Sequence, residues 1–86
     1  MASNLKRGSK GPDVSKLQKV LNDHIAAYGQ VTQFGANGKE LAIDGIFGPQ
    51  TEAWVKYYQS TRGLVADGIV GPKTKAALAE EWGLSL

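Results

Sequence analysis

The chain has 86 residues, of which 42% are hydrophobic, and it carries a formal net charge of +2. A chain of this length holds one hydrophobic core, so we expect a single domain, and its hydrophobic fraction is too high for a disordered tail. Cysteine is absent, which excludes a disulfide scaffold, thiol catalysis and cysteine-ligated zinc.

The start of the chain is locally basic. Positive side chains recur through this stretch, at Lys6, Arg7, Lys10, Lys16 and Lys19. Such a cluster can contact an anionic polymer, but a solvated face is the simpler interpretation. No apolar run approaches the roughly 20 residues that a membrane span needs, and none follows the first charges. We therefore expect neither a transmembrane segment nor a signal peptide.

The first helix is predicted to begin near Pro12. Proline favours the first helical position because its φ is fixed and its missing N–H has no partner there, and Gly11 is tolerated as the N-cap. Apolar residues at helical spacing follow, at Val14, Leu17, Leu21, Ile25 and Tyr28. Gly29 comes next, where a left-handed helix end favours glycine. His24, the only histidine, is expected on the surface of this helix.

A longer connection follows, from Gln30 to Ile43. Its Asn37-Gly38 pair is a turn signal between two weakly alternating stretches. The segment is therefore compatible with a short β-hairpin and equally with an irregular loop. A connection of this length inside a small domain often has a function.

An internal repeat dominates the rest of the chain. Segment 44–51 (DGIFGPQT) returns 23 positions later as segment 67–74 (DGIVGPKT), with six of the eight residues identical. A degenerate third copy is Gly11-Pro12, followed by Asp13. Each Asp-Gly pair predicts a turn, because aspartate accepts hydrogen bonds from nearby backbone amides and glycine supplies a positive φ. We expect these turns to be structural and also to shape a cleft.

Two more helices are predicted behind the repeats. Pro49 and Pro72 mark their first residues, and Gly63 and Gly83 mark their ends. Helical spacing follows each start, with Thr51, Val55 and Tyr58 beside Trp54 in one helix, and Thr74, Leu78 and Trp82 in the other. Three helices with the same start and stop signals predict an all-α fold, a compact three-helix bundle.

With these motifs, the sequence resembles the peptidoglycan-binding domain family, the three-helix wall-binding module of cell-wall hydrolases and phage endolysins. Segment 8–21 (GSKGPDVSKLQKVL) resembles the family's opening, segment 44–51 its central signature and segment 63–74 (GLVADGIVGPKT) its closing signature. The likeness covers residues 5–84 of a domain that we place at 1–86. Two departures are Trp54, where the family usually has a small residue, and an apparent insertion at about 24–42.

The resemblance implies non-catalytic binding of bacterial cell-wall peptidoglycan. Such binding would target an attached or partner lytic enzyme to its substrate. The partners implied are peptidoglycan and a catalytic domain in cis or in trans, with no cofactor, nucleic acid or membrane, and the module would be a monomer. Its site of action would be the cell wall, reached through a fused segment, holin-type release or virion delivery.

Peptidoglycan offers sugar rings with apolar faces and stem peptides with amides and carboxylates. A binder therefore needs an aromatic ledge and amide or cationic donors. We expect Trp54 and Tyr57 of the second helix, at the edge of the core, to form this ledge, and Arg62 at the end of that helix to bind a carboxylate. Core packing is the alternative for each aromatic. The predicted ligand-binding residues are Asp44, Phe47, Gln50, Trp54, Tyr57 and Arg62.

Other functions agree less well with the sequence. A single histidine permits no multi-histidine metal site, and no recognisable group completes a serine triad, so no catalytic residue or metal ligand is predicted. Asp44 and Asp67 could suggest a glycosidase pair, but the repeat explains both as turns. A helix-turn-helix DNA binder would need a more basic third helix than one ending in Glu80-Glu81. A protein-docking adaptor or a structural phage-particle module on the same bundle remains an alternative.

Overall fold

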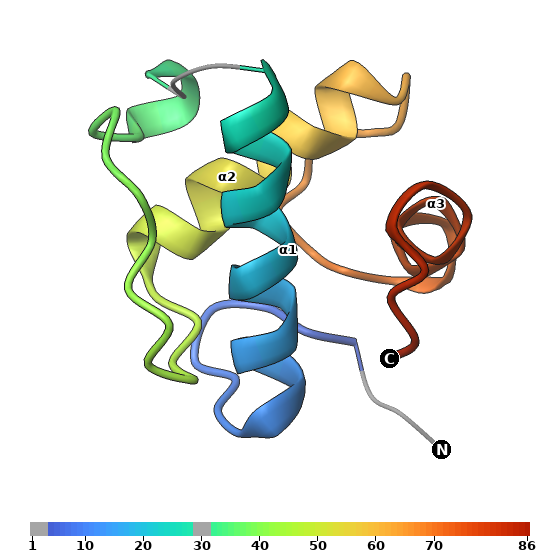
Figure 1. Ribbon diagram of the computed structural model, residues 1–86, viewed down its shortest axis with the longest axis horizontal. Coiled ribbons are helices and arrows are strands. Elements are labelled where there is room, and N and C mark those ends of the chain that lie inside the picture. The colour runs from blue at the N-terminus through green and yellow to red at the C-terminus, as the bar shows by residue number, and fades with distance from the viewer. Residues whose placement is uncertain (1–3, 29–31) are drawn as a thin grey trace.

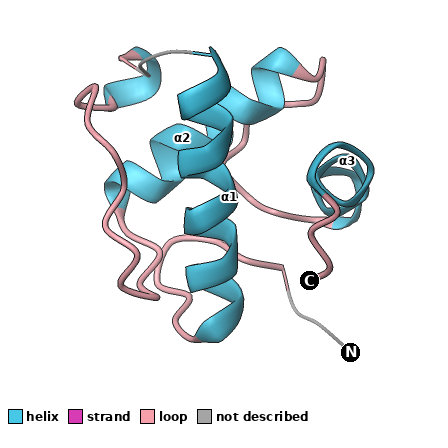
Figure 2. Ribbon diagram, viewed as in Figure 1, coloured by secondary structure: helices cyan, strands magenta, loops and turns pink. Residues whose placement is uncertain are grey.

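A computed structural model describes residues 4–28 and 32–86 of the chain. The elements in chain order are α1 (Pro12–Tyr28), the short 3-10 helix η1 (Gln33–Gly35), α2 (Pro49–Thr61) and α3 (Pro72–Trp82). In Figure 1, α1 crosses in front of α2, and α3 is seen end-on beside them. Figure 2 shows helices joined by loops, with no strand in the described part of the chain. The predicted all-α three-helix bundle is therefore confirmed.

All three helices begin at the predicted prolines. The glycines before the second and third helices, Gly48 and Gly71, have extended backbones, with φ of −101° and −95°. Each proline follows at the first helical position, where its fixed φ continues the helix and its missing N–H leaves no bond unmade. Over the described residues, no helix has the length and apolar character needed to cross a membrane.

The predicted glycine ends of α2 and α3 are also confirmed. Gly63 and Gly83 take left-handed backbones, with φ of 69° and 68°. After α2, the N–H of Leu64 donates to the carbonyl of Gln59 at 2.9 Å, as in a Schellman ending. Leu64 and Leu84 both pack against the core, so each helix end is closed by an apolar contact. Gly29, the predicted end of α1, lies outside the described residues.

The core is built from all three helices and from the loops between them. It includes two large aromatic rings from α2 together with leucine and valine side chains of α1. Its buried members are Leu5, Val14, Leu17, Leu21, Leu41, Phe47, Trp54, Val55, Tyr58, Val70, Ala77 and Leu78. Because Phe47 and Val70 come from the two repeats, both repeats are anchored in the same core.

The chain before α1 lies against both repeats. Leu5 pairs with Val70 through two backbone hydrogen bonds of 3.2 and 2.8 Å. A few residues on, Gly8 donates to the carbonyl of Phe47 at 3.0 Å, and Phe47 donates to the carbonyl of Ser9 at 2.9 Å. Figure 1 shows this segment in blue, running between the repeats and the start of α1. Through these bonds the N-terminal segment contacts both repeats, which lie 23 residues apart in the sequence.

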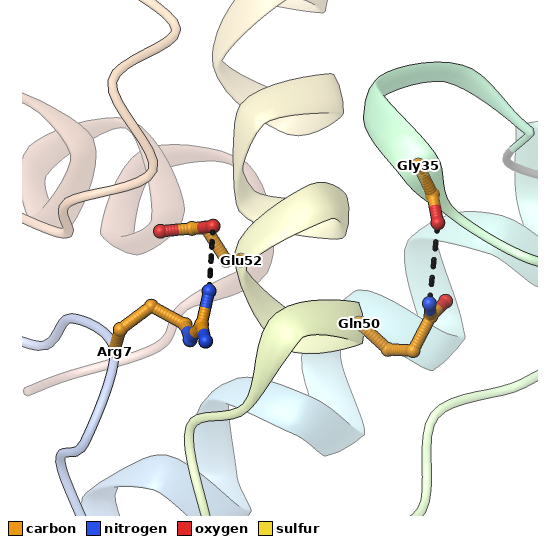
Figure 3. A network of polar contacts seen from close by, with 4 residues as sticks. All are labelled: Arg7, Gly35, Gln50 and Glu52. Atoms are coloured by element: carbon orange, nitrogen blue, oxygen red, sulfur yellow. Dashed lines mark hydrogen bonds and ion pairs between the residues drawn. The ribbon is translucent and has the colours of Figure 1, made fainter.

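The connection between α1 and α2 forms no hairpin over the described residues; it is an irregular loop containing η1. Of the two alternatives open from the sequence, the loop is therefore correct. Gln50 of α2 holds this loop and accepts from the N–H of Asn37 at 3.0 Å. It also donates to the carbonyl of Gly35 at 3.2 Å, the bond that Figure 3 shows. Asn22 of α1 holds its other end through two bonds to the backbone of Leu41, of 3.0 and 2.8 Å.

Candidate ligand-binding site

The first repeat folds around a buried glutamine of α1. We call segment 44–51 the first elbow. The side-chain Nε2 of Gln18 lies 3.0 Å from Oδ1 of Asp44, 2.9 Å from the carbonyl of Ile46 and 3.2 Å from the hydroxyl of Thr51. Its Oε1 accepts from the N–H of Gly45 at 3.0 Å. One side chain therefore satisfies polar atoms along the whole turn, which fixes the shape of the elbow.

The second repeat is built in the same way around Gln59 of α2. We call segment 67–74 the second elbow. Nε2 of Gln59 lies 3.0 Å from Oδ1 of Asp67, 2.9 Å from the carbonyl of Ile69 and 3.1 Å from the hydroxyl of Thr74. Its Oε1 accepts from the N–H of Gly68 at 3.0 Å. The two networks agree bond for bond, so the sequence repeat is a repeat of hydrogen bonding as well.

These two glutamines were not among the residues predicted from the sequence. Each follows a core residue of a helical stripe, in the pairs Leu17-Gln18 and Tyr58-Gln59. That shared position is the one signal that could have revealed them. It is obscured because Gln18 is 26 residues from its aspartate, whereas Gln59 is only 8 residues from Asp67.

The aspartates of the elbows have the predicted structural role. Oδ1 of Asp44 also accepts from the N–H of Ile46 at 3.0 Å, and Oδ1 of Asp67 from the N–H of Ile69 at 2.9 Å. These backbone hydrogen bonds, followed by the glutamine contacts, lower the pKa of each carboxyl below its ordinary value. Both groups are therefore carboxylates at neutral pH.

A pocket opens at each elbow. The first pocket has a volume of about 350 Å³, and the elbow and the α1–α2 connection line it together. Its lining includes Ile46, an apolar side chain that is 48% exposed, and two acidic residues, Glu40 and Asp44. The second pocket has a volume of about 570 Å³ and lies between the end of α2 and the start of α3. Both volumes lie within the range of small-ligand sites.

Two of the six predicted ligand-binding residues, Asp44 and Gln50, line the first pocket. Phe47 and Trp54 do not lie at the surface: each is 1% exposed and belongs to the core. The aromatic ledge expected from Trp54 and Tyr57 is therefore wrong for Trp54, because a domain this small uses its largest apolar side chains to fill the core. Core packing, the alternative for each, is the correct one.

Tyr57 and Arg62 line neither pocket. Tyr57 is half-buried against the core, with its ring centroid 6.3 Å from that of His24. Arg62 follows the last residue of α2, and its guanidinium lies 4.0 Å from the carboxylate of Glu81 in α3. The hydroxyl of Tyr58 donates to the same carboxylate at 3.0 Å. Tyr58 and Arg62 therefore join the end of α2 to Glu81 near the end of α3.

His24 is buried, with only 3% of its surface exposed, so the expected surface position is wrong. Its ring meets those of Tyr58 and Trp82 edge-on, at centroid distances of 5.1 and 5.9 Å. This burial lowers the pKa of His24, and the nearby carboxylate of Glu81 opposes the shift in part. His24 is thus a core residue of α1. Within residues 4–28 and 32–86, no cluster of three acidic, histidine or cysteine side chains could hold a metal ion.

Three helices with two matched elbow pockets define a small all-helical binding module. Residues 10–78 match the family described as "Putative peptidoglycan binding domain". The chain belongs to this peptidoglycan-binding family, which confirms the resemblance found in the sequence.

Known relatives agree with this assignment. The SleB N-terminal domain is 30% identical with a TM-score of 0.71, and the match covers 93% of each chain. A Burkholderia AP3 phage endolysin is 42% identical with a TM-score of 0.64, over 98% of this chain and 27% of the endolysin. A zinc D-Ala-D-Ala carboxypeptidase of Streptomyces albus G is 42% identical over 62 residues, which are 72% of this chain and 20% of the enzyme. The chain thus spans about a fifth of that curated relative.

Proposed function

We propose that this chain binds bacterial cell-wall peptidoglycan at the first elbow pocket and carries out no chemistry on it. The observation that carries the proposal is the position of this pocket. It is formed by segment 44–51, the part of the chain that resembles the family's central signature, and it is open to the surface. The accessible hollow and the family membership therefore point to the same residues.

The lining of the first pocket suits an uncharged part of the polymer. Ile46 offers an exposed apolar surface for a sugar face or an acetamido methyl group. Asp44 and Glu40 offer acceptors for sugar hydroxyls and amide N–H groups, and Oδ1 of Asp44 is held in place by Gln18 and Ile46. With two acidic side chains in its lining, this pocket disfavours a free carboxylate.

We further propose that the module brings a lytic enzyme to the wall, either as an attached domain or as a partner. Support comes from relatives of which this chain matches only a part, 27% of a phage endolysin and 20% of a carboxypeptidase. A weak site is sufficient for this role, because a tethered module rebinds a repeating polymer quickly. The module would act as a monomer outside the cytoplasm, delivered by a fused segment, holin-type release or the virion.

Co-sedimentation with washed cell-wall sacculi tests the proposal. The purified chain is expected to pellet with sacculi without lowering their turbidity, and Ile46→Ser is expected to weaken pelleting while the fold stays intact. Pelleting no better than that of a neutral control protein would refute wall binding, and a fall in turbidity would refute the non-catalytic role. Retention on duplex DNA at physiological salt, with none on sacculi, would favour a nucleic-acid partner.

A further inference from the structure

The second elbow pocket repeats the first almost position by position. Of the eleven residues that line each pocket, ten occupy equivalent positions: the buried glutamine, six positions of the elbow and three positions shortly before it. The same hydrogen bonds hold both elbows, with equivalent distances differing by 0.1 Å at most. If the first pocket binds part of the polymer, the second has the framework to bind another part.

The two pockets differ in charge. At the position where the first pocket has Gln50, the second has Lys73, which is exposed and makes no ion pair within the described chain. The second pocket has one acidic side chain, Asp67, which is hydrogen-bonded in the same way as Asp44 of the first pocket. The second pocket therefore has one cation available to an incoming carboxylate, whereas the first has two acidic groups and no cation.

The second pocket is also larger and more apolar in its exposed parts. Val65 is 79% exposed and Ile69 is 37% exposed, and both line it together with Leu64. Exposed branched side chains that gather in a hollow are typical of contact sites for small apolar groups. Its volume of about 570 Å³ gives room for a short peptide. Methyl-bearing residues that end in a carboxylate match both the apolar wall and the lysine.

We infer that the second elbow pocket is a separate subsite for the carboxylate-bearing end of a peptidoglycan stem peptide. This inference rests on the proposed wall binding and deepens it: the first pocket takes an uncharged part of the polymer and the second takes the peptide carboxylate. One small domain then holds its polymer at two points. Since the second contact is made within an existing complex, each pocket strengthens retention by the other.

The test uses soluble fragments and the whole chain. An amide-resolved NMR titration compares three ligands: a disaccharide without peptide, a disaccharide peptide with a free terminal carboxylate, and the same peptide with that end amidated. The free-carboxylate peptide is expected to shift the amide signals of Gly68 and Ile69, and the disaccharide only those of Gly45 and Ile46. Lys73→Gln is expected to raise the Kd of the free-carboxylate peptide roughly tenfold, by loss of one charge-assisted contact.

Lys16→Gln is the matched control, because Lys16 is an exposed lysine of α1 that lines neither pocket, and this variant removes the same charge. It is expected to bind all three ligands like the original chain. The inference is overturned if the free-carboxylate peptide shifts only first-elbow signals, or if Lys73→Gln and Lys16→Gln bind it equally well. Binding of the disaccharide at the first elbow, with a second elbow that stays silent toward the free-carboxylate peptide, would refute this subsite alone. No binding of any fragment or of sacculi would refute the proposed function as well.

Discussion

Replacing Gln59 by alanine tests how strongly the elbow network contributes to stability. Gln59 is 1% exposed, and its amide reaches three acceptors and one donor. Because an NH₂ group has two hydrogens, at most two of the acceptors are served fully at any moment. The side chain thus makes about three effective hydrogen bonds, one of them to a carboxylate.

The magnitude follows from this count. Two neutral bonds at about 1 kcal/mol each and one to a charged group at about 1.5–3 kcal/mol give a loss of about 3.5–5 kcal/mol. The N–H of Gly68 is left without its acceptor in a buried position, so water recovers little of this loss. An 86-residue domain has a free energy of unfolding of roughly 4–13 kcal/mol, so the variant loses a large part of its stability.

Urea denaturation followed by far-UV circular dichroism measures the effect. Gln18→Ala is expected to cost as much as Gln59→Ala, because the two networks are equivalent. Gln33→Ala is the control, since Gln33 is exposed and accepts one bond of 3.2 Å from the backbone of Thr32, and its change is expected within about 0.5 kcal/mol. A loss below about 1 kcal/mol in either elbow variant would show that the buried glutamines do not hold the elbows.

Further predictions concern pH and backbone conformation. Because burial lowers the pKa of His24, the imidazole takes up its proton at higher pH in the unfolded chain than in the folded one. The free energy of unfolding should therefore fall as pH drops from about 6.5, and urea titrations of His24→Phe should lack this fall. A second fall in the free energy of unfolding should appear below pH 3.8, because the lowered pKa values of Asp44 and Asp67 let the unfolded chain bind protons there before the folded chain does. This second fall should persist in His24→Phe. Gly68→Ala should cost about 1–2 kcal/mol by thermal denaturation, because φ is +75° there and a Cβ would lie 2.8 Å from Cγ of Glu52.

The helices were predictable because their signals are local. Pro49 and Pro72 fix the helix starts through their own φ, and Gly63 and Gly83 end α2 and α3 through theirs. None of these features depends on a distant part of the chain. The sequence of the α1–α2 connection did not decide between a hairpin and an irregular loop. Its backbone bonds to Gln50 of α2, which lies 13 residues after Asn37 and 15 residues after Gly35.

The site was only partly predictable, because it depends on which faces of α2 are covered. The helical spacing placed Trp54 beside the apolar stripe, where a ledge and a core position look alike. In the structure, more of the surface of α2 is covered than a single apolar stripe, because Ala53, Trp54 and Val55 are all buried in succession. Helical spacing alone does not show how much of α2 is covered, because segments far away in the sequence also contact this helix. One of them is the N-terminal segment, where Arg7 makes an ion pair of 3.3 Å with Glu52 of α2 (Figure 3).

Comparison of the two elbows separates the residues that hold the fold from those that can choose a ligand. The aspartate, glycine, isoleucine and threonine bound by each glutamine are the same in both copies. The residue between proline and threonine differs, as Gln50 in one and Lys73 in the other, and neither is bound by the central glutamine. A change at this position therefore leaves the network intact. The duplicated elbow is a frame of fixed shape in which the side chain at this position changes the charge of the pocket.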